Sequence, residues 1–165
     1  MQSTLRNVEE RLSVYLGLKH RLVGVKLIET ANDIKSSFQP PTPMAFCQMV
    51  RKASTRGDIF LYGLDYERCF TAQVVLGLRD PEHTGAGCRV LPSKTRRILV
   101  SPLAEISDEP DVILAILTPR QMMDLTAILR ETKGAPLSAE FAGERACAEF
   151  FATPYTEGKP NMSLL

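Results

Sequence analysis

The sequence lacks the motifs that identify most hydrolases and nucleotide-binding enzymes. It contains no glycine-rich phosphate loop, no nucleophile elbow and no paired-histidine metal motif, and its only histidines are His20 and His83. It has four cysteines but no C-x-x-C pair, which is the ligand spacing of zinc fingers and of many iron–sulfur proteins. No familiar catalytic motif therefore indicates a reaction.

An excess of charge of one sign and long hydrophobic runs are also absent. The chain carries 20 Lys and Arg against 19 Asp and Glu, a net charge of +1, so no overall field attracts it to nucleic acid or to an anionic membrane. No stretch reaches the roughly 18 apolar residues of a membrane span, and residues 1–20 mix charges among their apolar positions, unlike a signal peptide. We expect a cytoplasmic protein that binds neither nucleic acid nor a membrane.

The length and composition favour one globular domain over residues 1–165. The chain has 165 residues, of which 44% are hydrophobic, and a core of this size needs no disulfides. In a cytoplasmic protein the cysteines are expected to be reduced thiols. They are Cys47, Cys69, Cys88 and Cys147.

Apolar periodicity, capping residues and prolines predict five helices and a sheet of four or five strands. The predicted helices cover residues 4–18, 43–56, 66–76, 119–133 and 139–152, and predicted strands cover 21–29, 58–62, 97–103 and 111–117. The last strand is apolar on both sides and is predicted to lie in the middle of the sheet. The pattern predicts an α+β or α/β domain with a mixed central sheet.

The helix over residues 119–133 has the clearest local signals. Thr118 is a typical N-cap, Pro119 suits the first turn, and Gln121 completes a capping box. Gly134 marks the end of the helix.

Several segments together resemble one known family. They are GVKLIE, FCQMVRKASTRG, ERCFTAQVVLGL, PLAEISDEPDVILAILTPRQMMDL and ACAEFFATPYTEGKPNMSLL. The chain resembles the domain of unknown function 169 family, which is common in archaea and anaerobic bacteria. The most specific part is the series EPDV, apolar strand and P-x-Q-x-M, from Glu109 to Met123.

The resemblance points to particular residues. Cys47, Cys69 and Cys147 match cysteine positions of the family, whereas Cys88 does not, and Lys26 matches a recurrent lysine of the first strand. Members of the family typically continue past the GKPN.SL element into a further cysteine and arginine motif. The resemblance therefore implies a chain that is naturally short or is truncated before that motif, and a site that lacks a fourth sulfur ligand.

The three matching cysteines have three interpretations. They are buried packing groups, a shared site for a soft metal ion or an iron–sulfur cluster, or reactive thiols. Cys69, in the first turn of a predicted helix and beside Arg68, is expected to be the most reactive thiol. Cys47, about one turn into its helix, lacks this advantage, and Cys147, predicted in mid-helix, is expected to be the most buried.

Other candidate residues are weaker. Lys26 is a candidate ligand-binding residue, although a solvated side chain is the simpler interpretation. Met122 and Met123 follow helical spacing and are interpreted as core residues. His83 lies in the irregular segment 79–97 and has no nucleophile near it in sequence.

Two functions follow as hypotheses. The first is a cysteine-dependent metal-binding, iron–sulfur or redox-accessory domain of anaerobic metabolism, with Cys47, Cys69 and Cys147 facing one pocket beside the 79–97 loop. The second is a small-ligand-binding or protein-interaction module whose cysteines are structural. The candidate partners are a second copy of the chain or a redox protein, and the sequence does not decide whether the protein is an enzyme.

Overall fold

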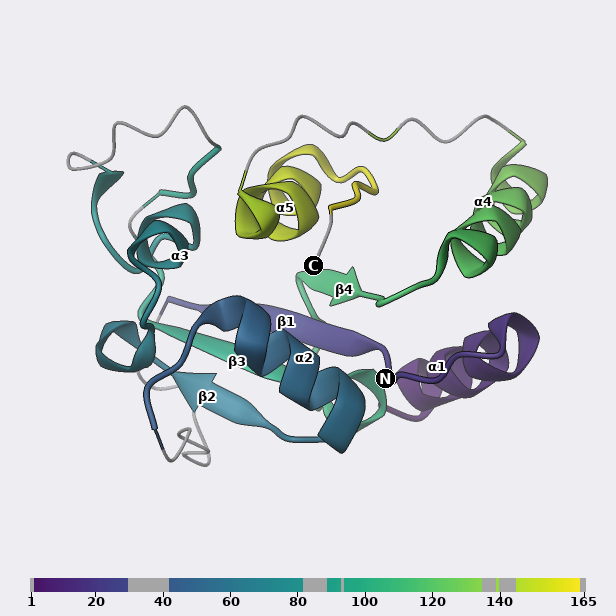
Figure 1. Cartoon of the computed structure of the whole chain (residues 1–165), viewed down its shortest axis with the longest axis horizontal. Helices are drawn as coiled ribbons and strands as arrows, with labels where there is room; N and C mark the ends of the chain where they lie inside the picture. Colours follow the sequence, from purple (N-terminus) through teal and green to yellow (C-terminus); the bar gives the residue numbers. More distant parts are fainter. Residues whose placement is uncertain are drawn as a thin grey trace.

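The fold is an antiparallel sheet with helices around it, as Figure 1 shows. The computed structural model describes residues 2–29, 42–81, 89–92, 94–134, 139 and 145–163. In chain order the elements are α1 (Gln2–Leu16), β1 (Val23–Ile28), α2 (Phe46–Arg56), β2 (Phe60–Tyr62), a 3₁₀ helix (Leu64–Tyr66), α3 (Phe70–Val75), β3 (Arg97–Pro102), a second 3₁₀ helix (Leu103–Glu105), β4 (Val112–Leu114), α4 (Pro119–Lys133), a π-helix (Ala148–Ala152) and α5 (Thr153–Glu157).

The sheet has four strands in the order β2-β3-β1-β4. All three strand pairs are antiparallel, with Val25 opposite Val100 in the central pair and Tyr62 opposite Ile98 at the β2 edge. The predicted α+β class is confirmed, and the described residues form five α-helices and four strands, in agreement with the predicted five helices and four or five strands. The sheet itself is antiparallel rather than mixed, because no pair of the four described strands runs parallel.

The prediction that the strand after Asp111 lies in the middle of the sheet is wrong. β4 pairs only with β1, over Val23 to Val25, and forms an edge of the described sheet. Its alternate residues differ in exposure, since Ile113 is 48% exposed whereas its two neighbours are buried. An apolar sequence in a strand therefore does not show that both faces of that strand are buried.

One face of the sheet carries the main core. Buried side chains of β1, β2 and β3 form one hydrophobic cluster with α2, with α3 and with the helical run that contains the π-helix. α2 lies across this face in Figure 1, and α3 and α5 lie beside it. Within the cluster, the Phe46 ring of α2 stacks on Phe150 at 5.6 Å and meets Phe151 edge to face at 5.8 Å.

A buried carboxylate connects α1 to the sheet. Glu9 is 6% exposed and accepts hydrogen bonds from the backbone amides of Leu22 at 3.1 Å and Ala104 at 2.7 Å. Around it, Leu22, Leu103 and Ile106 form a second, smaller core cluster with the apolar side of α1. α1 is therefore held by both polar and apolar contacts.

Two predicted helix starts are corrected. α2 begins at Phe46 rather than at Pro43, because Met44 is extended and forms a β-bridge with Glu67. The predicted helix over residues 66–76 is divided for the same reason, since the bridge interrupts it between the 3₁₀ helix and α3. The predicted end of α2 is confirmed, because Gly57 adopts a left-handed conformation with φ of 80°.

The remaining helix predictions have mixed outcomes. α4 has the predicted bounds, N-cap and terminal glycine. The last helix was predicted to end at Ala152 but continues to Glu157, with Pro154 in the first turn of α5. Its predicted cap, Ser138, and residues 140–144 lie outside the described residues, and Ala139, its predicted first residue, is not helical. Among the described helices, none is both long and apolar enough to cross a bilayer.

Candidate functional site

The site begins with a β-bridge that joins two helix starts. The Met44 amide donates to the Tyr66 carbonyl at 3.0 Å, and the Arg68 amide donates to the Met44 carbonyl at 3.2 Å. The bridge is parallel, so both chains leave it in the same direction. Cys47 follows on one chain and Cys69 follows on the other, and the bridge thus brings together two thiols that are distant in sequence.

Glu67 occupies the centre of this arrangement. Its side chain is buried, and Oε1 accepts hydrogen bonds from the backbone amides of Phe46 at 3.2 Å and Cys69 at 2.9 Å. The second carboxylate oxygen accepts one from the Tyr62 hydroxyl at 3.3 Å. Glu67 therefore satisfies the free amide at the start of α2 and the amide that precedes α3.

Glu67 is poised to change charge near neutral pH. Burial raises the pKa of its carboxyl to about 7, although the amides of Cys69 and Phe46 and the Tyr62 hydroxyl oppose the rise. Burial dominates because the charged form loses more hydration than these donors return. A buried carboxyl with such a pKa is able to take up or release a proton under physiological conditions.

Cys47 lies in the first turn of α2, which corrects its predicted place one turn into the helix. Burial raises the pKa of its thiol, the backbone amide of Gln48 lowers it, and the charges of Cys69 and Glu67 raise it further. The two thiols and the carboxylate therefore interact electrostatically. Cys69 was predicted in the first turn of its helix, but it is the N-cap of α3, one residue before the first helical residue.

Cys147 approaches the same group from the C-terminal helical run. Burial raises the pKa of the Tyr62 phenol well above its usual range, and the charges of Glu67, Cys147 and Cys47 raise it further. All three cysteines are partly buried, and Cys69 and Cys147 pack against the main core. The predicted order of burial and reactivity among them stays a prediction, and Cys88 lies outside the described residues.

The C-terminal segment is hydrogen-bonded to the helical run that carries Cys147. Glu149, which is 2% exposed, lies in the π-helix, and its carboxylate accepts a hydrogen bond from the Ser163 hydroxyl at 2.6 Å. The side-chain amide of Asn161 donates to the Glu149 carbonyl at 3.0 Å. The GKPN.SL element thus folds back on the turn that follows Cys147, and π-helical turns often occur at functional sites.

The cysteines fit a soft metal in their chemistry but not in their arrangement. Thiolates are ligands for zinc and for iron–sulfur clusters. Across the part of the chain that the structure describes, however, no three Cys, His, Asp or Glu side chains are placed to hold a metal ion. The predicted pocket beside the 79–97 loop falls partly outside the described residues, which do not include 82–88 and 93.

Lys26 lies away from the thiols. Val25 points into the main core, which also contains Tyr62, so its neighbour Lys26 belongs to the opposite face of the sheet. The Lys26 ammonium donates to the carbonyl of Glu109 at 2.8 Å. The structure does not bring this predicted ligand-binding residue together with the three cysteines.

The EPDV motif is hydrogen-bonded to β1 beside Lys26. The carboxylate of Asp111 accepts from the Leu27 amide at 2.7 Å, and the Asp111 amide donates to the Val25 carbonyl at 2.9 Å. β4 begins at the next residue. The recurrent lysine and the EPDV motif therefore hold the same two segments together.

Sequence reasoning missed Glu67 and Tyr62, the buried, hydrogen-bonded pair that interacts with the thiols. The sequence carries no local signal for them, because the bridge that positions Glu67 pairs it with Met44. Met123 was also misjudged, since it is 68% exposed rather than in the core, whereas Met122 is partly buried.

Comparison with known proteins identifies the family. The family model of domain of unknown function 169, described as an uncharacterised ArCR family, matches residues 11–94 and 83–165. No curated protein and no solved structure matches the chain. Because the two family matches together span residues 11–165, the protein belongs to the domain of unknown function 169 family.

Proposed function

We propose that this protein is a cysteine-dependent metal-binding or redox-accessory domain whose site is formed by Cys47, Cys69 and Cys147 around Glu67. One observation carries the proposal, namely that the Met44–Glu67 bridge and the hydrogen bonds of Glu67 hold the starts of α2 and α3, which carry Cys47 and Cys69, beside the buried Glu67–Tyr62 pair. The charge of Cys147 acts on Tyr62 as well. The reducing cytoplasm of an anaerobe is the setting in which such thiols persist, and we place the function there.

Glu67 would serve as the proton acceptor of the site. Thiols must lose their protons before they bind a metal or attack a disulfide, and a neighbouring base with a pKa of about 7 accepts such a proton. Protonation of Glu67 also removes a negative charge beside Cys47. The thiolate is therefore favoured when Glu67 is protonated, whereas an ionised Glu67 raises the pKa of the Cys47 thiol and disfavours it.

The redox form of the proposal uses Cys47 and Cys69 with a disulfide of a redox protein partner. One thiolate attacks the partner disulfide and forms a mixed disulfide, and the second thiolate then releases the partner. The pair loses two electrons and two protons and gains an S–S bond, while the partner disulfide becomes a dithiol.

The metal form of the proposal needs a change of arrangement. A soft metal ion or an iron–sulfur cluster, when bound, would supply Lewis-acid or electron-transfer chemistry. Cys47, Cys69 and Cys147 are the residues that would hold it, once they had moved into ligand distance.

The alternative function treats the cysteines as structural groups in a small-ligand-binding or protein-interaction module. It is favoured by the packing of Cys69 and Cys147 against the main core. Under this alternative, replacement of either thiol by alanine changes stability but neither metal content nor disulfide formation.

Metal and thiol analysis of the protein purified without oxygen tests these functions. Iron, zinc and acid-labile sulfide are measured in the native chain and in Cys47→Ala, Cys69→Ala and Cys147→Ala, with Cys88→Ala as the matched control. Stoichiometric metal that only the control retains supports the metal form. A Cys47–Cys69 disulfide, formed with oxidised glutathione and mapped by mass spectrometry, supports the redox form. Folded, metal-free protein that forms no such disulfide would falsify both forms.

A further inference from the structure

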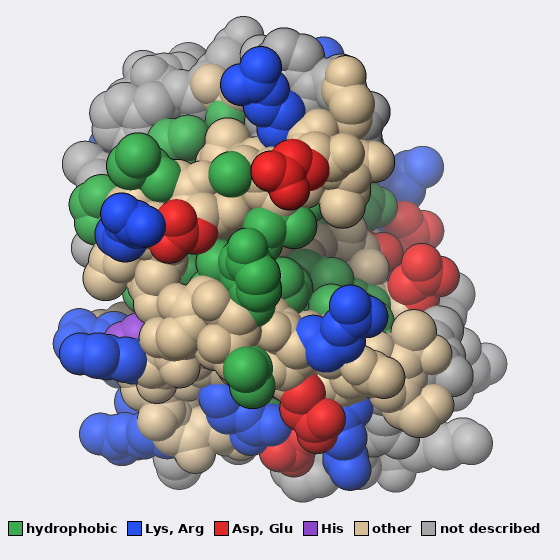
Figure 2. Space-filling model, turned by 90° about the vertical axis from the view of Figure 1, so that its right-hand side faces the viewer, with side chains coloured by type: hydrophobic (Ala, Val, Ile, Leu, Met, Phe, Trp, Pro, Cys, Tyr) green, Lys and Arg blue, Asp and Glu red, His purple; other side chains and the backbone are tan. Residues whose placement is uncertain are grey.

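The end of the molecule that carries α1 and α4 has an apolar groove. Its volume is about 470 Å³, and it is lined by Val8, Leu12 and Tyr15 of α1 and by Ile128 of α4, with Arg11 and Glu131 also in its wall. Figure 2 views this end and shows hydrophobic side chains in a hollow, with charged side chains around it. α3 lies at the other end of the molecule in Figure 1.

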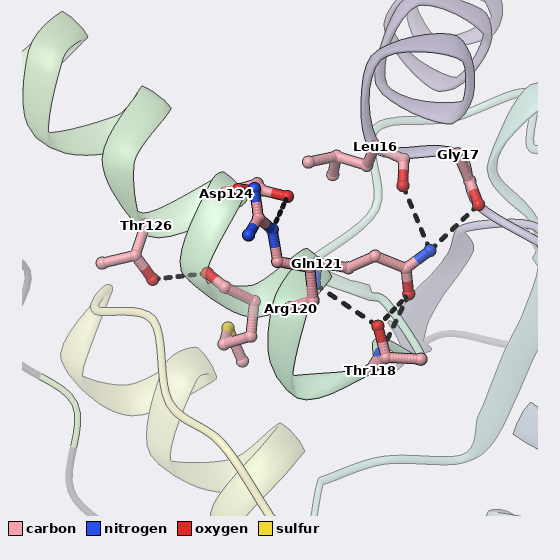
Figure 3. Close-up of polar contacts among 8 residues, drawn as sticks. Leu16, Gly17, Thr118, Arg120, Gln121, Asp124 and Thr126 are labelled. Atoms are coloured by element: carbon pink, nitrogen blue, oxygen red, sulfur yellow. Dashed lines mark hydrogen bonds and ion pairs between the residues drawn. The ribbon is translucent and has the colours of Figure 1, made fainter.

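The two helices are joined where α1 ends and α4 begins. The side-chain amide of Gln121 donates to the carbonyls of Leu16 at 3.1 Å and Gly17 at 3.0 Å, as Figure 3 shows. Its carboxamide oxygen accepts from the amide of Thr118 at 2.9 Å. Gln121 thus caps α4 and fixes it to α1, and both walls of the groove have a defined position.

Little of α4 is covered by the described chain. None of its described side chains is buried, although the helix has 15 residues and includes Met122, Met123, Leu125, Ile128 and Leu129. α1 likewise exposes Tyr15 by 70% and Val14 by 84%. Because packing of an apolar face supplies most of the stability of a helix, this face is suited to contact with a partner.

The charges in the groove wall identify that partner. Arg11 of α1 and Glu131 of α4 are both exposed, and neither forms an ion pair within the described part of the chain. In a twofold dimer every contact occurs twice, because a contact between two residues of different copies is repeated with the copies exchanged. Arg11 of each copy would then meet Glu131 of the other, so the surface is complementary to itself.

We propose that a second copy of this chain docks on the α1/α4 face, as a twofold dimer. The exposed Tyr15 ring of each copy enters the apolar groove of the other, and two Arg11–Glu131 ion pairs close the rim. A large aromatic anchor surrounded by polar groups is the usual composition of a stable contact. The resulting interface is a bundle of four helices, distant from the thiols.

A charge exchange between the two positions tests the dimer. The mass in solution is measured by sedimentation over a range of concentrations for the native chain, for Arg11→Glu and for Glu131→Arg. Each single variant places like charges opposite each other twice, and we expect its self-association to weaken by about tenfold or more. An equimolar mixture of the two variants restores opposite charges at both contacts and should associate as the native chain does.

The controls separate docking from folding. Arg51→Glu makes the same charge change at an exposed site on α2 and should leave the mass unchanged. Tyr15→Ser removes the proposed anchor and should weaken the dimer, while circular dichroism of every variant remains native because the changed residues are exposed. A native chain that is monomeric at every concentration overturns the proposal. So does a mixture that fails to associate, and so does a monomer that binds an amphipathic helix of another protein in this groove.

Discussion

The hydroxyl of Tyr62 donates a hydrogen bond of 3.3 Å to the carboxylate of Glu67, and both side chains are buried. The pair lies where α2 and α3 begin, and the charges of Cys47 and Cys147 also act on Tyr62. A proton gained or lost by Glu67 is therefore felt by the phenol and by the Cys47 thiol. This coupling gives the site a dependence on pH that can be measured.

Glu67→Gln should remove a pH dependence of stability. The pKa of Glu67 is about 7 in the folded chain against an ordinary value of 4.5 for a glutamate in water, so between these values the unfolded state binds fewer protons than the folded state. The free energy of unfolding of the native chain should then fall as the pH rises from 4.5 to 7, by on the order of 3 kcal/mol, and remain level above pH 7. Urea denaturation at several pH values measures the difference between the native chain and the variant.

The comparison isolates one group because every other titrating residue is common to both proteins. The glutamine oxygen is still able to accept from the amides of Phe46 and Cys69, so the variant keeps the capping contacts. Parallel curves for the two proteins between pH 4.5 and 7 would show that Glu67 has an ordinary pKa. Tyr62→Phe should shift the midpoint above 7, because the Tyr62 hydroxyl lowers the pKa of Glu67.

The elements that could be predicted from the sequence are those with local signals. α4 was predicted with its correct bounds because its cap, its first-turn proline and its terminal glycine all lie within or beside it. The position of β4 was wrong because an apolar run reports hydrophobicity and not the number of covered faces. That number depends on which strands pair, which is a long-range property.

The candidate site, too, could be predicted from the sequence only in part. The three cysteines were selected on their resemblance to family positions, and a site shared by all three stays a prediction. In the structure Cys47 and Cys69 follow the Met44–Glu67 bridge, and the charge of Cys147 acts on Tyr62. Glu67 itself was missed because the bridge that positions it pairs it with Met44, far away in the sequence. A glutamate two residues before a cysteine has no signal of its own, and burial, which raises its pKa, follows only from tertiary packing.

Thr118→Ala should cost about 1 kcal/mol of unfolding free energy through loss of the helix cap. The Thr118 hydroxyl accepts from the Gln121 amide at 3.3 Å, and the variant leaves this amide without an intramolecular acceptor (Figure 3). Thr132→Ala, an exposed threonine of the same helix, is the matched control and should change stability by less than about 0.5 kcal/mol. Equal losses in urea denaturation of the two variants would count against the cap. Neither change should alter metal content or thiol reactivity.

Asp111→Ala should destabilise the edge of the sheet by about 1 to 3 kcal/mol, because the Leu27 amide loses its carboxylate acceptor. Lys26→Met removes the contact with the Glu109 carbonyl but keeps the aliphatic part of the side chain, and we expect a smaller loss. Thermal unfolding measures both. A larger loss of stability for Lys26→Met than for Asp111→Ala would contradict the expectation that the Asp111 contact contributes more. A loss of ligand binding without a loss of stability would assign Lys26 a functional role.

The reactivity of Cys47 should depend on the charge of Glu67. Above pH 7 the carboxylate is ionised, and its charge raises the pKa of the Cys47 thiol, in addition to the effect of burial. Glu67→Gln removes that charge, so the thiolate fraction at pH 8 should increase and alkylation of Cys47 by iodoacetamide should accelerate by about threefold to tenfold. Mass spectrometry of the digested protein measures the rate at each cysteine separately.

Cys88 is the control thiol for this experiment, and the same digest gives the order of the four thiols. We expect Cys69 to react first in the native chain, because it precedes the free amides of α3. An unchanged rate at Cys47 in Glu67→Gln would mean that the carboxylate does not act on the thiol, and the proton transfer proposed between them would have to be abandoned. A rise at all four cysteines together would instead report general loosening of the fold, which circular dichroism of the variant distinguishes from a local effect.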